Sequence, residues 1–184
     1  DEWQTKAEPS YAYAGPEDLR PYDRCITRGV LGSTFPNIYS SAMWILQSPG
    51  FLVIHHEMIH ETRVIPLDGR PHVDDDIRLW TGDSRGHWEG DTLVVETTNY
   101  SSETKYNGAS EGLRLVERFT RVGPDTVQQE VTLEDPATWT QPWTVVLLLT
   151  STEDPIFEYA CHEGNYAMPG ILGGARLEEK MSQT

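Results

Sequence analysis

The densest group of side chains that could do chemistry is a set of four histidines between residues 55 and 72. They are His55, His56, His60 and His72. Neutral imidazole is the commonest metal ligand in proteins, and three imidazoles with one carboxylate suit zinc, copper or iron. Residues 56–60 also spell HExxH, a pattern in which one helix presents both imidazoles to a zinc ion.

The residues around this pattern favour strands rather than a helix. Val53 and Ile54 precede it and Val64 and Ile65 follow it, and such β-branched residues favour extended structure. On one continuous strand His56 and His60 would share a face and His55 would point away. We therefore expect hydrogen-bonded structural or pocket histidines. No cofactor is firmly expected, and the alternative is a divalent metal held by His56 and His60 together with a distant residue such as His72 or His162.

Two polar loops, at residues 68–72 and 82–91, follow the histidines. Glycine and aspartate are ordinary turn formers, so the simplest interpretation is a pair of well-made turns. Their density of Arg, Asp, His and Trp also fits the rim of a ligand site at one end of a barrel. The residues expected to bind a ligand there are Asp68, Arg70, Trp80, Asp83, Arg85 and Trp88.

Several ionisable residues interrupt segments that otherwise look buried: Glu96, Glu117, Arg118 and Glu130. In a sandwich these side chains would lie on solvated faces. In a barrel the alternate side chains point into a cavity, where burial raises the pKa of a Glu enough for acid/base work. On the barrel interpretation we expect Glu96 to be catalytic. Arg63, Glu117 and Arg118 are expected to bind the ligand.

Residues 158–166 place further polar side chains near the end of the chain. Cys161 and His162 are adjacent, and neighbours on a strand point to opposite faces, so they cannot form a thiol–imidazole dyad. We expect Tyr159 and His162 to bind the ligand and Glu163 to act as a catalytic carboxylate.

The elements that must position these residues read as strands. Val127, Val131 and Leu133 alternate with polar residues, as in a half-buried strand. Turn chemistry at residues 90–91 and 123–125 predicts hairpins. The predicted extended segments are residues 51–57, 61–66, 86–89, 91–98, 113–122, 126–134, 143–151 and 156–161. A short helix is predicted over residues 73–80.

About eight such strands predict an all-β, mainly antiparallel fold. We expect a calycin/lipocalin-like β-barrel over residues 51–177 and a polar tail over residues 178–184. Residues 1–50 are rich in Pro and Gly and predict an irregular N-terminal arm with a helical turn near residues 16–19. The aromatic residues of the arm indicate that it packs on the domain.

The composition excludes some partners. Fourteen basic against 29 acidic side chains give a formal charge of -15, which repels nucleic acid and anionic lipid. No apolar run approaches the roughly 20 residues that cross a bilayer, so membrane insertion is not expected. The two cysteines, Cys25 and Cys161, are either one long-loop disulfide or two unrelated buried thiols, and their spacing leaves both open.

Three strings carry a resemblance that covers about residues 20 to 177. They are IPLDGRPH (residues 65–72), GDSRG with WEGDTLVVET (82–97) and EYACHEGNY (158–166). The chain thereby closely resembles a widespread family of secreted bacterial proteins to which no reaction is assigned. The resemblance implies an extracytoplasmic location and a Cys25–Cys161 bridge. His55 and His56 fall where the family pattern is loose, which leaves His60, His72 and His162 as the better candidates.

The sequence thus predicts an extracytoplasmic enzyme that acts by acid/base chemistry on a small organic or carbohydrate-like molecule. His60 or His72, with a carboxylate, would act in a pocket at the barrel mouth, where residues 68–91 face His162 and Glu163. The alternatives are a non-catalytic periplasmic module that binds a small ligand or metal, and a purely structural envelope protein. The oligomeric state is left open.

Overall fold

The computed structural model describes residues 13–39, 41–103 and 108–183. The chain divides into two compact units. Among the described residues, the smaller unit contains residues 13–26 and 160–183, and the larger unit lies within residues 27–159.

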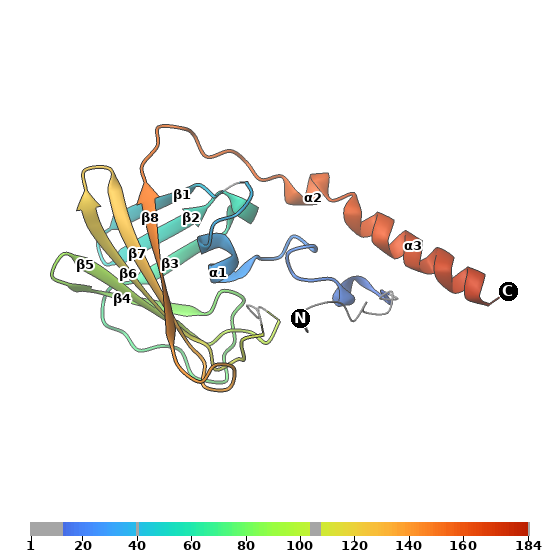
Figure 1. Ribbon diagram of the computed structural model, residues 1–184, viewed down its shortest axis with the longest axis horizontal. Helices are drawn as coiled ribbons and strands as arrows, with labels where there is room; N and C mark the ends of the chain where they lie inside the picture. Colours follow the sequence, from blue (N-terminus) through green and yellow to red (C-terminus); the bar gives the residue numbers. More distant parts are fainter. Residues whose placement is uncertain (1–12, 40, 104–107, 184) are drawn as a thin grey trace, which may run out of the picture. The chain divides into compact units, whose positions relative to one another are not determined.

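The described residues of the larger unit form eight strands in two antiparallel sheets (Figure 1). Within each sheet, every strand pairs with its neighbours in the chain, and β3 and β4 are not paired with each other. The three-stranded sheet runs β1 (Met43–Ser48), β2 (Phe51–His56), β3 (Thr62–Pro66). The five-stranded sheet runs β4 (Asp83–Glu89), β5 (Thr92–Thr98), β6 (Arg114–Gly123), β7 (Thr126–Glu134), β8 (Trp143–Thr150). The predicted mainly antiparallel β architecture is therefore confirmed.

Turn residues explain this order. Gly90 has a φ of 60° and lies between β4 and β5, where a tight hairpin turn needs the left-handed conformation. The sequence Gly123-Pro124-Asp125 connects β6 to β7 in the same short way. Each hairpin fixes the register of its strands and so decides which side chains share a face.

Both sheets contribute to a common core, and alternation along the strands shows how. On β6 the buried residues Leu115, Glu117 and Phe119 alternate with the partly exposed Arg114 and Arg118. One core cluster joins the sheets through Leu52, Ile54, Ile65, Leu93, Val95 and Phe119. A second joins helix α1 (Gly29–Thr34) to the five-stranded sheet through Val30, Leu31, Leu115, Val131 and Leu133. We call the side of each sheet that faces these clusters the inner face and the opposite side the outer face.

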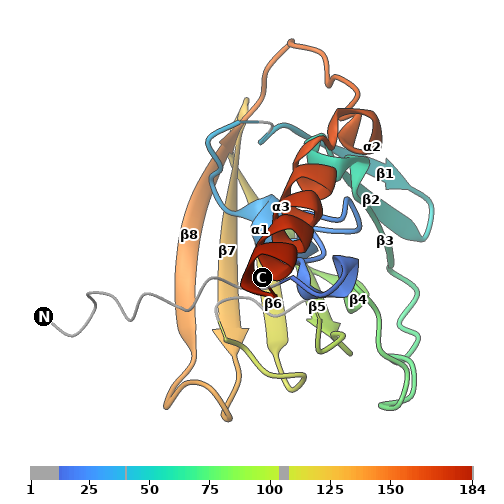
Figure 2. The ribbon, with the colours of Figure 1, turned by 90° about the vertical axis from the view of Figure 1, so that its right-hand side faces the viewer.

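The edge strands are β1 and β3 in the three-stranded sheet and β4 and β8 in the five-stranded sheet. In the part of the chain that the structure describes, β1 and β8 are not paired with each other. Figure 2 separates β8, on one side of the view, from β1–β3 on the other. No closed barrel is therefore found in the described residues.

Several sequence predictions differ from the structure. Residues 73–80 form turns and irregular backbone instead of a helix, and residues 156–160 form no strand. Strand β1 and helix α1 lie within the predicted irregular arm. Residues 178–182, predicted as part of a polar tail, belong to helix α3 (Ala167–Ser182).

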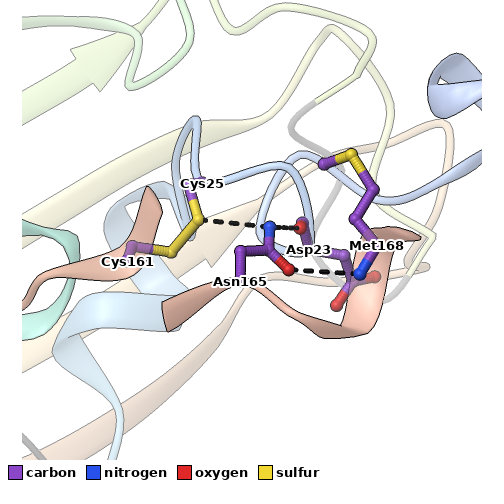
Figure 3. The surroundings of a disulfide bond; sticks show 5 residues. All are labelled: Asp23, Cys25, Cys161, Asn165 and Met168. Atoms are coloured by element: carbon purple, nitrogen blue, oxygen red, sulfur yellow. Dashed lines mark hydrogen bonds between the residues drawn. A yellow bond between two sulfur atoms is a disulfide. The ribbon is translucent and has the colours of Figure 1, made fainter. Parts of the chain in front are cut away.

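The smaller unit is closed by a disulfide. Cys25 and Cys161 are bonded across 136 residues of sequence, so the predicted bridge is confirmed (Figure 3). Asn165 supports it, because its Nδ2 donates to the carbonyl oxygen of Asp23 at 2.8 Å. The same nitrogen also lies 3.5 Å from Cys25 Sγ. The unit also contains the 3-10 turn η1 (Pro16–Asp18), which confirms the predicted helical turn, and the short helix α2 (Cys161–Gly164).

None of the helices among the described residues combines the length and the apolar character needed to span a membrane.

Candidate functional site

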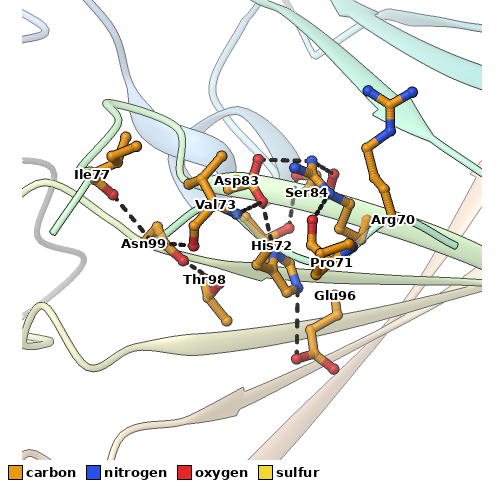
Figure 4. A network of polar contacts seen from close by, with 12 residues as sticks. Arg70, Pro71, His72, Val73, Ile77, Asp83, Ser84, Glu96, Thr98 and Asn99 are labelled. Atoms are coloured by element: carbon orange, nitrogen blue, oxygen red, sulfur yellow. Dashed lines mark hydrogen bonds and ion pairs between the residues drawn. The ribbon is translucent and has the colours of Figure 1, made fainter. Parts of the chain in front are cut away.

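His72 lies between two carboxylates in the larger unit (Figure 4). Its Nδ1 is 2.8 Å from Asp83 Oδ2, and its Nε2 is 3.8 Å from Glu96 Oε1. The imidazole is about a quarter exposed. Since a carboxylate accepts hydrogen bonds only, Asp83 holds the proton of neutral His72 on Nδ1 and leaves Nε2 as the basic nitrogen.

Asp83 begins strand β4, and its carboxylate is buried. It accepts a hydrogen bond from the backbone N–H of Val73 at 3.3 Å and pairs with Arg85 at 2.7 Å. Arg85 in turn donates from Nε to the carbonyl oxygen of Pro71 at 3.0 Å. The carboxylate and the guanidinium therefore bind the backbone on both sides of His72 and hold its ring in place.

Gly82 allows the chain to enter β4 at this point. Its φ is +69°, and a Cβ there would lie 2.5 Å from the carbonyl oxygen of Thr98. Any other residue would be strained by both the backbone conformation and this contact. The glycine of the Gly-Asp-Ser-Arg-Gly string is thus required to place Asp83 beside β5.

Asn99 holds the segment that follows His72. This residue has a φ of 59°, a conformation that asparagine tolerates better than most residues. Its Nδ2 donates to the carbonyl oxygens of Asp74 at 3.0 Å and Ile77 at 3.1 Å, with Val73 at 3.4 Å (Figure 4). Asn99 was not predicted as a site residue, although an asparagine directly after a strand is a signal for a left-handed turn position.

Glu96 is held ionised by its own partner. Its Oε2 accepts a hydrogen bond from Arg114 at 2.6 Å, and Arg114 also binds Glu134 at 3.1 Å. The hydrogen bond from Arg114 lowers the pKa of Glu96 and outweighs its partial burial. Glu96 therefore stands beside His72 as an anion rather than as a proton donor.

A second polar group lies on the inner face, and we call Arg63, Ser84, Thr97, Glu117 and Gln129 the inner cluster. Arg63 makes two hydrogen bonds to Glu117, at 2.6 and 3.2 Å, and both side chains are almost fully buried. Arg63 also donates to Ser84 at 3.2 Å and Thr97 at 3.3 Å, and Gln129 donates to Glu117 at 3.0 Å. Burial alone would lower the pKa of Arg63, but the Glu117 carboxylate raises it, so the guanidinium stays charged.

The structure thus brings together part of the predicted site. His72, Asp83, Arg85 and Glu96 form one group. Their register places Arg85 opposite Glu96, on the outer face rather than inside the fold. Arg63 and Glu117 form the other group, on the inner face.

The remaining predicted residues lie elsewhere. Asp68 and Arg70 are exposed and pair with each other, and Arg118 pairs with Glu89 at 2.7 Å. Trp80 and Trp88 are 39% and 49% exposed, and Tyr159 is partly buried near the end of the larger unit. His162 and Glu163 are exposed on α2 in the smaller unit.

The HExxH string does not adopt the zinc-binding arrangement. His56 ends β2 on the inner face and is buried, whereas His60 is exposed at the end of the 3-10 turn η2 (Met58–His60). Within residues 13–39, 41–103 and 108–183, no group of three or more His, Cys, Asp or Glu side chains is placed to hold a metal ion. A surface depression lined by Asp91, Arg121 and residues 122–124 lies at the hairpin turns and does not include His72.

Comparison of the chain with models of known protein families, with curated proteins and with solved structures gave no match. The geometry around His72 and the inner cluster is therefore the basis for the function inferred below.

Proposed function

We propose that the protein is an extracytoplasmic enzyme that acts by acid/base chemistry on a small organic or carbohydrate-like molecule at His72. One observation carries the proposal. The partly exposed His72 is oriented by the buried Asp83 on one ring nitrogen and faces the ionised Glu96 with the other.

The arrangement supplies the parts that proton transfer needs. Nε2 of His72 can take a proton from a substrate, and Asp83 then stabilises the imidazolium through Nδ1. The 3.8 Å between His72 Nε2 and Glu96 Oε1 is longer than a good hydrogen bond, so both acceptors stay available to a third group. A water molecule can donate one O–H to each acceptor, and a substrate hydroxyl can donate to either of them.

The location and the resemblance belong to the same proposal. A disulfide between Cys25 and Cys161 favours an oxidising compartment. The strings at residues 65–72 and 82–97, on which the family resemblance rests, contain His72, Asp83 and Glu96. A barrel-like arrangement of the larger unit is also part of the proposal, and it is supported by the core cluster that both sheets share.

The test measures turnover of p-nitrophenyl esters and p-nitrophenyl glycosides by the purified full chain. We expect His72→Ala to lower kcat/KM at least about a hundredfold, the ordinary contribution of a general base. Glu96→Gln should lower it about tenfold, because the anion next to the imidazolium is lost. No turnover by the wild type, or full turnover by His72→Ala, would overturn the proposal.

Two control variants show whether the loss of turnover is specific to His72 or follows from removing any histidine. His87 lies on the same strand as Asp83, is exposed and pairs with Glu89 at 3.2 Å. His60, the other predicted catalytic histidine, is exposed on η2. His87→Ala and His60→Ala should both retain wild-type kcat/KM, and a loss in either variant equal to that in His72→Ala would contradict the assignment.

A further inference from the structure

Three buried polar atoms around the inner cluster have no hydrogen-bond partner among the described residues. They are Arg63 Nε, Gln129 Oε1 and His56 Nε2, and we call them the unpaired atoms. Buried polar atoms are nearly always paired, because leaving one unpaired forfeits its hydration without replacement. Ile54 is the register partner of Arg63, and His56 lies two residues after Ile54 on the same face of β2. The unpaired Nε2 of His56 is therefore also on the inner face, near Arg63.

The chemistry of these atoms limits what can satisfy them. Arg63 Nε is a donor and Gln129 Oε1 is an acceptor, whereas the imidazole nitrogen of His56 can be either. The charges of Arg63 and Glu117 already cancel in their ion pair. A carboxylate or phosphate would add an uncompensated buried charge and could not donate to Gln129. An uncharged group that both donates and accepts, such as a hydroxyl, fits best.

The apolar surroundings of the inner cluster are incompletely covered at β1 and β8. Inner-face residues of the central strands are fully buried, as Ile54 and Val131 show. On the edge strands the inner-face residues stay partly exposed: Ile45 is 39% exposed, and Met43 and Leu149 are half-buried. We call the side of the larger unit bounded by Met43, Ile45 and Leu149 the open side.

The open side and the inner cluster are neighbours through the strand register. Met43 of β1 pairs directly with His56 of β2. Leu147 of β8, two residues before Leu149, pairs directly with Gln129 of β7. Two of the three unpaired atoms, on His56 and Gln129, therefore lie on the strands that pair with the edge strands β1 and β8. Met43 and Leu149 also pack against the core cluster that contains Leu52, Ile54 and Phe119.

We propose that the inner cluster and the open side together bind an amphipathic small molecule with an uncharged, hydroxyl-type head and an apolar body. The head forms hydrogen bonds with the unpaired atoms of Gln129, His56 and Arg63. The body covers Met43, Ile45 and Leu149. This site is on the inner face, separate from His72 on the outer face, so its failure would leave the proposed enzymatic function standing.

A series of probes with the same chain tests the head-group requirement by isothermal titration calorimetry of the full chain. Octanol should bind saturably, at one molecule per chain. Octanoate should bind at least about tenfold more weakly, because its charge would be buried unpaired. Glycerol, which lacks the apolar body, should give no heat of binding. No saturable octanol binding, or octanoate binding as tight as octanol, would overturn the proposal.

A pair of neighbouring residues tests the location. Leu149 is on the inner face of β8, and Leu148 is on its outer face and 67% exposed. Leu149→Glu should abolish octanol binding and Leu148→Glu should retain it. Gln129→Leu should weaken octanol about fivefold, the usual size of one hydrogen bond. Equal loss in both leucine variants would contradict the site.

Amide hydrogen exchange of the wild-type chain locates the binding site without any variant, and so tests the proposal even if Leu149→Glu does not fold. Saturating octanol should slow amide exchange in β1 and β8, the unpaired edges of the open side, and leave the outer-face loop that carries His72 unchanged. Octanol protection that is absent from both edge strands, or confined to the His72 loop, would overturn the proposal independently of any variant.

Discussion

Glu117 and Arg118 are consecutive residues on β6, and each forms an ion pair, but the two pairs lie on opposite faces. Glu117 meets Arg63 on the inner face, where the two side chains are 1% and 3% exposed. Arg118 meets Glu89 on the outer face, where the two are 38% and 49% exposed. The two ion pairs therefore differ in the free energy lost when one partner is removed. A buried charge that loses its partner is not hydrated by water, whereas an exposed charge is.

The same contrast separates what each face can do. The inner cluster is buried and held by hydrogen bonds, so its polar groups suit recognition of a ligand that brings matching groups. The group around His72 is partly exposed, so protons can exchange with solvent and a substrate can approach. Alternation along β4, β5 and β6 builds both environments from neighbouring residues.

The largest expected effect comes from breaking the inner pair. Glu117→Ala leaves Arg63 as a buried charge without a counterion and removes the acceptor of Gln129. We expect it to lower the free energy of unfolding by about 3–5 kcal/mol, measured by urea denaturation. Arg118→Ala, at the next position, is the matched control and should leave the unfolding midpoint unchanged.

A double substitution separates the lost pair from the cavity left by alanine. Arg63→Met combined with Glu117→Leu removes both charges and keeps most of the volume, so it should recover part of the stability that Glu117→Ala loses. The inner face would not have the energetic role described here if Glu117→Ala and Arg118→Ala unfolded at the same urea concentration.

His56 and His55 provide the same contrast through pH. Burial, with Arg63 nearby, lowers the pKa of His56 from 6.5 to about 4. As the pH falls below 6.5, His56 of the unfolded chain binds a proton, whereas His56 of the folded chain is protonated only near pH 4. The stabilisation is thus complete above pH 6.5 and is lost on acidification. The loss should reach about 3 kcal/mol near pH 4.

Urea unfolding at pH 7 and pH 5 measures this effect. His56→Leu should flatten the pH dependence, because no buried imidazole then remains to resist protonation. His55→Leu is the matched control, since His55 is on the outer face and hydrogen-bonds to Thr62 at 2.8 Å. Equal flattening by both variants would show that the face of the strand does not determine the effect.

The strands could be predicted from sequence where alternation and turn chemistry agree. Residues 126–134 alternate and follow Gly123-Pro124-Asp125, and they form β7. β1 (Met43–Ser48) was missed because its consecutive apolar residues do not alternate and turn-forming residues surround it. The helix predicted over residues 73–80 was wrong, because Asn99 binds the carbonyl oxygens of Asp74 and Ile77 from a distant position.

The site was predictable only in its parts. His72 with a carboxylate was predicted, and the hairpin at Gly90 explains why Arg85 and Glu96 are register partners. The pairing of His72 with Asp83 depends on how the loop folds back, which local sequence does not encode. Whether Glu117 or Arg118 points inward depends on which face meets the core, and this requires both sheets to be in place.

Asp83 and Asp68 offer a smaller test, because each pairs with an arginine two residues further along the chain. Asp83 is buried and also binds Val73 and His72, whereas Asp68 is exposed with Arg70. Asp83→Ala should cost about 1–3 kcal/mol of unfolding free energy, because three donors lose their acceptor. Asp68→Ala should match the wild type. Thermal unfolding followed by circular dichroism compares the two variants, and equal melting temperatures would contradict this prediction.

The smallest expected effect on stability comes from Arg114, which changes the pKa of Glu96 on the outer face but contributes little to the free energy of unfolding. Arg114 lowers the pKa of Glu96, so the stabilisation from their pair is present above the ordinary pKa of 4.5 and is lost on acidification. Both side chains are more than a third exposed, so Arg114→Ala should cost no more than about 1 kcal/mol at pH 7.

The informative readout for Arg114 is therefore the titration of Glu96 rather than stability. Carbon-detected NMR of the Glu96 carboxyl group should show its pKa rising towards 4.5 in Arg114→Ala, because the hydrogen bond that favours the anion is gone. Arg118→Ala should leave the Glu96 titration unchanged, since Arg118 pairs with Glu89 instead. If Glu96 titrates identically in both variants, solvent screens this face so completely that Arg114 does not set the charge beside His72. If the titration shifts only in Arg114→Ala, the outer face can adjust a proton-transfer group at little cost in stability, which the buried pair on the inner face cannot do.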